Sequence, residues 1–174
     1  MYKRQVGKPL KFNWGKCPLA TASFGHGITT TLLQISKAYS IIVNGGHDLN
    51  PTFLKKTQNS KKKLILDKNV SKKILPILRK IVYTKEGTAT LANIDGYDIG
   101  GKTGTAQKSI GGNYSKKKIN SFISVFPISN PKFILAVMLD EPKINSEDIY
   151  HFRDGSNIKY KGTPFNTAGW TTVE

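Results

Sequence analysis

The chain has 174 residues, 38% of them hydrophobic, which is enough for one globular domain with a core of ordinary size. No apolar run approaches the roughly 18 residues that a membrane-spanning helix needs, and the residues after Met1 form no apolar core of a signal peptide. A single cysteine, Cys17, excludes an internal disulfide and lies in a loop-like stretch where we expect no catalytic thiol.

The net charge is +16, because 27 lysines and arginines outnumber 11 acidic residues. Clustered lysines can neutralise phosphates or attract anionic lipids and cell-wall polymers. No aromatic residue is regularly interleaved with them, however, and solvated loops and helix faces also account for short lysine runs. We therefore expect no nucleic acid as partner, although a basic module that binds nucleic acid or an anionic polymer remains the alternative. The runs are Lys55–Lys56, Lys61–Lys63, Lys72–Lys73 and Lys116–Lys118.

The N-terminal residues 1–22 lack periodicity and contain several glycines and prolines, which predicts an irregular lead-in. Next, Ser23–Ile28 places two glycines around His26, a pattern typical of a tight loop. No carboxylate or second histidine lies near His26 in the sequence. We therefore expect this histidine to be structural rather than catalytic.

A first helix is predicted to begin after Thr31, because Gln34 three residues later completes a capping-box signature. Apolar residues then recur at helical spacing along one face, and Asn44–Gly46 provides a C-terminal stop. The residues on that face are Leu32, Ile35, Tyr39, Ile42 and Val43.

Residues 47–69 are polar and lysine-rich with one short apolar run, Leu64–Leu66, which predicts a loop carrying one or two short strands. A second helix is predicted from Ser71 to about Tyr83, where Pro76 should kink the helix or delay its start. Its apolar stripe consists of Ile74, Leu78, Ile81 and Val82.

The stretch Tyr97–Lys108 contains Lys102-Thr103-Gly104-Thr105, here called the KTGT segment. The lysine supplies a compact positive charge, the hydroxyl can donate to or accept from a carboxylate, and the glycine lets a ligand lie flat against the backbone. If the segment belongs to an edge strand, the N–H of Thr105 can donate to a substrate carbonyl that becomes negative in a transition state.

Two further strands are predicted after a polar loop at Ser109–Lys118. Ser121–Ile128 is rich in β-branched and aromatic residues, and Phe133–Leu139 is nearly all apolar, as in a buried central strand. The short turn at Asn130-Pro131 makes consecutive strands antiparallel, so they form a meander with the KTGT strand. Helices packed on the faces of this antiparallel sheet would give a three-layer α/β/α sandwich, a fold of the α/β (α+β) class. Residues 141–174 read as an irregular tail.

The motifs resemble those of class B penicillin-binding proteins, the peptidoglycan transpeptidases of division and elongation, with the overall pattern closer to the division type. Gly96-Tyr97 and Lys102–Lys108 match their extended Lys-Thr-Gly motif. The segment Gly25–Gly46 is similar to the family's series Gly-x-Gly-Ile, Thr-Pro-Leu-Gln, Ala-Tyr and Asn-Gly-Gly. It departs from that series at Leu32, where the family usually has proline. Residues 87–92 and Ala168-Gly169-Trp170 resemble further family segments, the former with an expected packing role. The resemblance implies a β-lactamase/transpeptidase-like fold.

The resemblance also implies a chemistry. A serine in a Ser-x-x-Lys motif attacks the D-Ala-D-Ala carbonyl of a stem peptide, an acyl-enzyme forms, and penicillins acylate the same serine. By this resemblance Lys102, Thr103, Gly104 and Thr105 bind substrate, with Thr103 toward its carboxylate and the Thr105 N–H toward the oxyanion. No cofactor and no metal are implied. The implied partners are peptidoglycan stem peptides, β-lactams and division-complex membrane proteins.

The nucleophile motif has no credible counterpart in the sequence. Ser60–Lys63 and Ser115–Lys118 have its spacing but lie in predicted polar loops. The family's Ser-x-Asn motif, a turn that assists proton transfer, does not occur in the sequence either. We therefore expect residues 1–174 to be the C-terminal portion of one transpeptidase domain, incomplete and inactive alone, with the nucleophile and an inner-membrane anchor upstream and the domain in the periplasm. A relationship to serine β-lactamases is a third hypothesis.

Overall fold

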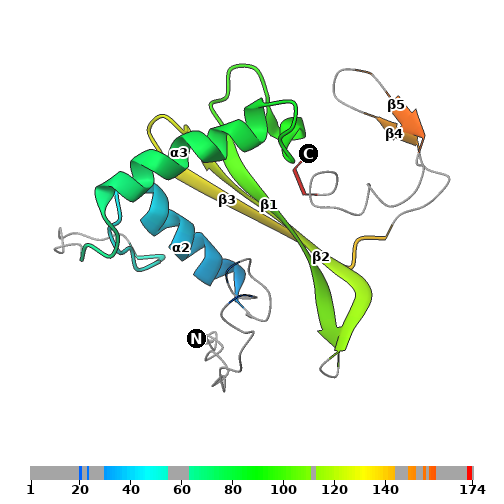
Figure 1. Ribbon diagram of the computed structural model, residues 1–174, viewed down its shortest axis with the longest axis horizontal. Helices are drawn as coiled ribbons and strands as arrows, with labels where there is room; N and C mark the ends of the chain where they lie inside the picture. Colours follow the sequence, from blue (N-terminus) through cyan, green and yellow to red (C-terminus); the bar gives the residue numbers. More distant parts are fainter. Residues whose placement is uncertain are drawn as a thin grey trace.

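The computed structural model describes Ala20, Ser23 and residues 30–54, 63–110, 113–143, 149–151, 155, 157–159 and 172–173 (Figure 1). The predictions for Cys17, for His26 and for residues 168–170 lie outside the described residues, as does nearly all of the expected lead-in. Among the described residues, no helix has the length and apolar character that a membrane span requires. No group of three or more metal-ligating side chains occurs in that same part of the chain.

Helix α2, Leu32–Val43, begins and ends as predicted. The Thr31 hydroxyl accepts from the Gln34 N–H at 3.2 Å, and the Gln34 side chain accepts from the Thr31 N–H at 2.8 Å, which completes the capping box. Beyond the C-cap, Gly46 has φ +89° and lies so close to the Leu66 carbonyl that a side chain would collide with it. Two residues beyond the C-cap Asn44, the chain therefore passes through a position where only glycine fits.

Helix α3, Lys68–Tyr83, begins earlier than the predicted Ser71. Asp67 caps it, because its carboxylate accepts from the Asn69 N–H at 2.7 Å, and Pro76 within the helix does not delay the start. The predicted stripe is confirmed: Leu78 and Val82 are buried and the other two residues are half-buried. Between the helices, the described residues 47–54 and 63–67 form an isolated bridge between His47 and Leu64, and the rest of this stretch lies outside the described residues.

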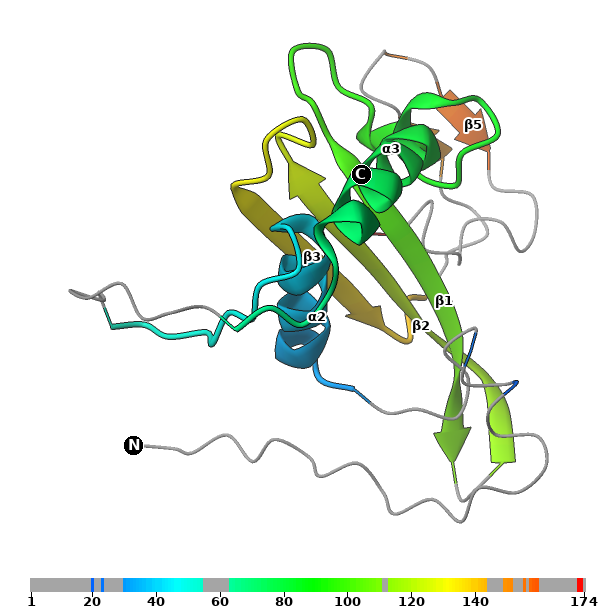
Figure 2. The same ribbon diagram turned by 60° about the vertical axis from the view of Figure 1, so that its left-hand side comes forward.

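The predicted antiparallel meander is confirmed. Strands β1 (Gly100–Ile110), β2 (Asn113–Phe126) and β3 (Phe133–Asp140) form a sheet of order β1-β2-β3 (Figure 2). The predicted polar loop at Ser109–Lys118 was wrong, since most of it belongs to the arms of the β1–β2 hairpin. These arms extend beyond the helices, where both strand faces can be polar, so no apolar alternation reveals them in the sequence.

The prediction that Phe133–Leu139 is a buried central strand was also wrong. In the described part of the chain β3 pairs with β2 alone and lies at an edge of the sheet. Phe133 is 60%, Leu135 53% and Met138 50% exposed. An apolar run predicts a strand that can be buried on both faces, but here the described residues cover β3 only in part.

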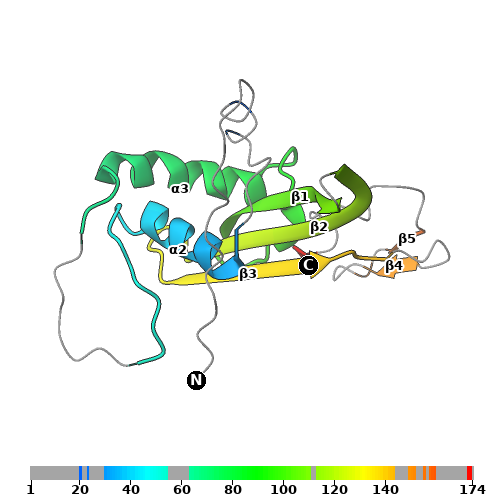
Figure 3. The same cartoon turned by 90° about the horizontal axis from the view of Figure 1, so that it is seen from below.

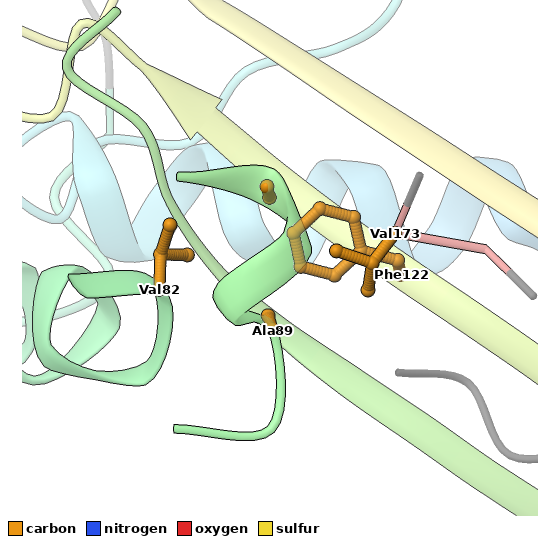
Figure 4. Close-up of a cluster of buried hydrophobic side chains, with 5 residues drawn as sticks. Val82, Ala89, Phe122 and Val173 are labelled. Atoms are coloured by element: carbon orange, nitrogen blue, oxygen red, sulfur yellow. The ribbon is translucent and has the colours of Figure 1, made fainter. Parts of the chain in front are cut away.

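Helices α2 and α3 pack together on the sheet face that carries Val125 and Ile134 (Figure 3). The core there contains Val43, Leu78, Val125 and Ile128. On the opposite face, Phe122 packs in a second cluster with Ala89 and Val173, and Val82 from the end of α3 joins it (Figure 4). The result is an incomplete α/β fold, in which the described residues provide one layer of helices against the sheet.

Residues 141–174 were expected to be irregular, but part of them forms a small antiparallel sheet. Its strands are β4, Ile149–His151, and β5, Asn157–Lys159. Strands of only three residues are too short to show a periodic pattern in the sequence.

Candidate functional site

The structure places the KTGT segment on β1, at the edge of the sheet and not in a helix. Lys102 and Thr105 are exposed, and Thr103 and Gly104 are half-buried. Among the described residues, β1 pairs only with β2, so its other side borders no further strand. All four predicted residues thus lie together on β1, which is an edge strand of the described sheet.

The four side-chain positions alternate between the two faces of the strand. Lys102 and Gly104 share a face with their β2 partners Ile123 and Ser121, whereas Thr103 lies on the face of Phe122. The ammonium and the hydroxyl therefore approach the edge from opposite faces of the sheet, and a ligand lying along the edge can meet both.

The hydroxyl of Thr103 has a partner that the sequence analysis missed. Its Oγ1 lies 2.8 Å from the Oγ1 of Thr88, a hydrogen-bond distance. The predicted packing role of residues 87–92 is confirmed by Ala89 and Ala92, which are buried. This buried anchor holds the exposed Thr88 beside the KTGT segment. No local pattern could reveal the contact, because it joins two ordinary threonines 15 residues apart.

Two hydrogen bonds indicate which way the backbone of the segment points. The Ser121 hydroxyl donates to the Gly104 carbonyl at 3.4 Å, so that carbonyl faces β2. The Lys102 ammonium donates to the Thr103 carbonyl at 2.7 Å, on the other side of the strand. Since backbone groups alternate along an antiparallel strand, the N–H of Thr105 points to the same outer edge as the Thr103 carbonyl.

Gly104 leaves the middle of the KTGT segment without a side chain. A Cβ built at this position would lie 2.7 Å from the Ser121 hydroxyl oxygen. The absence of a side chain therefore leaves both the Ser121 hydroxyl and the strand backbone accessible from one face.

The surroundings of Lys102 differ from those of Lys108 on the same strand. Within the described part of the chain, no carboxylate lies at ion-pair distance from the Lys102 ammonium. By contrast, Lys108 lies 2.8 Å from Glu141 and 2.9 Å from Asp140, and hydrogen bonds to these carboxylates raise its pKa. Lys102 is thus the cation on β1 that can meet an anionic ligand.

The described serine–lysine pairs do not form a nucleophile motif. Ser115 and Lys118 lie on β2 rather than in the predicted loop, and residues three apart on a strand point to opposite faces. Two more pairs with this spacing, Ser129–Lys132 and Ser156–Lys159, were overlooked in the sequence. Ser129 and Lys132 lie in the turn between β2 and β3, not at the start of a helix. Ser60 and Ser156 lie outside the described residues.

Comparison with known proteins assigns the chain to one family. The family model for the penicillin-binding protein transpeptidase domain matches residues 3–156. A probable peptidoglycan D,D-transpeptidase, PenA of Neisseria flavescens, is 36% identical over 133 residues, which are 76% of this chain and 33% of that protein. This chain therefore spans about a third of the length of that curated relative.

Solved structures give the same result. The apo transpeptidase domain of penicillin-binding protein 3 from Burkholderia pseudomallei matches with a TM-score of 0.71 and 32% identity, covering 79% of this chain and 45% of that one. Penicillin-binding protein 3 from Mycobacterium tuberculosis, complexed with ampicillin, matches with a TM-score of 0.68 and 25% identity, covering 75% of this chain and 33% of that one.

Proposed function

Because this chain belongs to the penicillin-binding protein transpeptidase domain family, we propose that it forms part of the active site of a peptidoglycan D,D-transpeptidase. The KTGT segment would bind the D-Ala-D-Ala end of a stem peptide. The observation that carries this proposal is the accessible strand edge on which Lys102, without a carboxylate neighbour in the described residues, lies next to the Thr103–Thr88 hydroxyl pair.

Each group in the segment would have a distinct role. The Thr103 hydroxyl would donate to the substrate carboxylate, and Lys102 would supply the opposite charge. The outward N–H of Thr105 would donate to the carbonyl oxygen that becomes negative as the nucleophile attacks, which is where hydrogen-bond donors contribute most to catalysis. Gly104 would let the peptide lie against the strand.

The covalent steps would use a serine outside residues 1–174. Its oxygen would attack the carbonyl of the penultimate D-Ala, the ester would form as the terminal D-Ala leaves, and an amine of a second stem peptide would then displace the serine. β-Lactams would acylate the same serine, in keeping with the ampicillin complex of a related protein. The complete enzyme would be anchored in the inner membrane, act in the periplasm and associate with division proteins.

The missing nucleophile is tested directly with the 174-residue chain. When the chain is incubated with a fluorescent penicillin, we expect no covalent label on a denaturing gel, while a complete penicillin-binding protein in the same reaction is labelled. Labelling of the chain would refute this part of the proposal. Sequencing upstream of the Met1 codon should reveal an in-frame Ser-x-x-Lys and Ser-x-Asn, and an in-frame stop directly upstream would contradict a longer enzyme.

The role of the KTGT segment is tested in the complete transpeptidase. Lys102→Ala should lower the rate of penicillin acylation by about a hundredfold, because a preorganised charge at a substrate carboxylate is lost. Lys132→Ala, at an exposed lysine in the β2–β3 turn, is the matched control and should leave the rate unchanged. Equal effects of both changes would contradict the proposal. Salt-sensitive DNA binding that Lys102→Ala leaves intact would instead favour a basic binding module.

A further inference from the structure

Arg79 of α3 reaches the residues that immediately precede β1. Its guanidinium donates to the Ile99 carbonyl at 2.8 Å, and its Nε lies 3.7 Å from the Asp98 carboxylate. The guanidinium also lies over the Tyr83 ring, 5.1 Å from its centroid, in cation–π contact. One side chain with several fixed partners thus links the helix to the start of the strand.

Asp98 in turn links the start of β1 to the turn between β2 and β3. Its carboxylate accepts from the Ser129 N–H at 2.8 Å, and its backbone carbonyl accepts from the Ile128 N–H at 2.7 Å. The hydrogen bonds from Ser129, together with the charge of Arg79, lower the pKa of Asp98, so the carboxylate stays ionised at neutral pH.

Gly100, two residues after Asp98, is held by close packing. A Cβ at this position would lie 3.1 Å from the backbone nitrogen of Arg79 and 2.7 Å from the Cδ1 of Ile128. Helix α3 therefore lies directly against the first residue of the strand. Three consecutive residues, 98 to 100, are thus fixed by the same helix and the same turn.

We propose that Arg79 and Asp98 are positioning residues for the KTGT segment, an inference that rests on the proposed function. Asp98 precedes Lys102 by four residues, about 13 Å along an extended strand. From Gly100 to Gln107 the strand is paired with β2 in unbroken register. A shift at residues 98–100 would therefore be carried along the strand to Lys102 and Thr103, and losses of this kind lower catalytic rates without any change in the reacting groups.

Hydrogen exchange on the 174-residue chain tests the structural half of the proposal. In Arg79→Gln and Asp98→Asn, we expect the amides of Lys102 and Gly104, which point toward β2, to exchange about tenfold faster, while those of α2 stay unchanged. The double variant should add less than the sum of the two single ones, since both changes weaken the contact between Arg79 and Asp98. The matched control is Asp48→Asn, which breaks the Lys37–Asp48 ion pair of 3.0 Å and should leave β1 unaffected. Unchanged exchange in β1, or an equal rise throughout the chain, would overturn the proposal.

Acylation of the complete transpeptidase by a fluorescent penicillin tests the functional half. Both variants should acylate about tenfold more slowly at an unchanged melting temperature, and Arg79→Lys should recover part of the rate because an ammonium can still donate to the Ile99 carbonyl. Faster exchange with a normal acylation rate would overturn the positioning role and leave the proposed function intact. If the wild-type enzyme is not acylated, the proposed function fails instead, whatever the exchange data show.

Discussion

At the scale of single residues, the site depends on what lies next to the KTGT segment as much as on the segment itself. The sequence predicted Lys102, Thr103, Gly104 and Thr105, and the structure brings them together on one strand edge. It could not predict Thr88 at 2.8 Å from the Thr103 hydroxyl, because that contact depends on how a loop packs against the sheet.

The Thr88 contact leads to a first prediction. Thr88→Val keeps the shape of the side chain but removes its hydroxyl, so Thr103 loses the partner that orients it. A hydrogen bond of this kind contributes roughly 0.5–1.5 kcal/mol, which corresponds to about a 2- to 12-fold slower penicillin acylation in the complete enzyme. The matched control is Thr84→Val, which removes a side-chain hydrogen bond of equal length to the Lys80 carbonyl. An equal rate loss in both variants would contradict a specific role for Thr88.

A second prediction concerns Gly104. In Gly104→Val the new side chain would meet the Ser121 hydroxyl, 2.7 Å from the position of its Cβ. Because a serine side chain can rotate away, we expect a loss of stability of about 1 kcal/mol in chemical unfolding, the low end of what overpacking costs. Acylation should fall by more than about tenfold, since a branched side chain keeps the ligand off the backbone. Adding Ser121→Ala should restore the stability but not the rate; a restored rate would show that the defect was only steric strain.

At the scale of elements, the predicted ends of a helix were correct where the sequence contains both a capping residue and a stop. The capping box at Thr31 and the glycines after α2 fixed both ends of that helix. The outer arms of the β1–β2 hairpin were mistaken for a loop, because their stability comes from cross-strand contacts rather than from an apolar pattern. Glu141 is one such contact: it lies 2.8 Å from Lys108 of β1 and 2.9 Å from Lys117 of β2.

A third prediction follows from this cluster, which joins β1 and β2 to the residue that follows β3 (Phe133–Asp140). Hydrogen bonds from Lys108 and Lys117 lower the pKa of Glu141 from 4.5 to about 2. Since the folded-state pKa is the lower one, the stabilisation is complete above about pH 4.5 and is lost as the pH falls toward 2. Thermal unfolding of Glu141→Gln should therefore depend less on pH in this range than that of the wild type, most clearly at low salt. Glu86→Gln, at an exposed glutamate, should reproduce the wild-type pH dependence; a parallel curve for Glu141→Gln would refute the assignment.

At the scale of the whole molecule, the sequence predicted the fold class and the antiparallel meander but not how much of the sheet is covered. The apolar run Phe133–Leu139 fits a strand with neighbours on all sides, whereas the described part of the chain leaves Phe133, Leu135 and Met138 half or more exposed. The pattern of apolar residues in a strand indicates which side chains can be buried. It does not indicate which other part of the protein covers them.

A fourth prediction concerns this exposed strand. Apolar side chains at a sheet edge favour association with other chains, so the 174-residue chain should self-associate as its concentration rises. Leu135→Lys should shift that association to higher concentration, as measured by sedimentation velocity. Ile77→Lys, at an exposed apolar residue of α3, is the matched control and should have little effect. A monomeric wild type at high concentration would contradict the prediction.

The hydrogen bond from the Lys102 ammonium to the Thr103 carbonyl has a consequence for ligand capture. In the structure the Lys102 ammonium is hydrogen-bonded to a carbonyl of its own main chain, so an anion that binds Lys102 would have to draw the ammonium away. That exchange would replace a neutral acceptor with a charged one and would free the Thr103 carbonyl to accept a hydrogen bond from an N–H of the ligand. Binding of a carboxylate to the Lys102 ammonium would thus expose the Thr103 carbonyl as a second binding group. A ligand that has a carboxylate but no neighbouring N–H would make only the first of these two contacts.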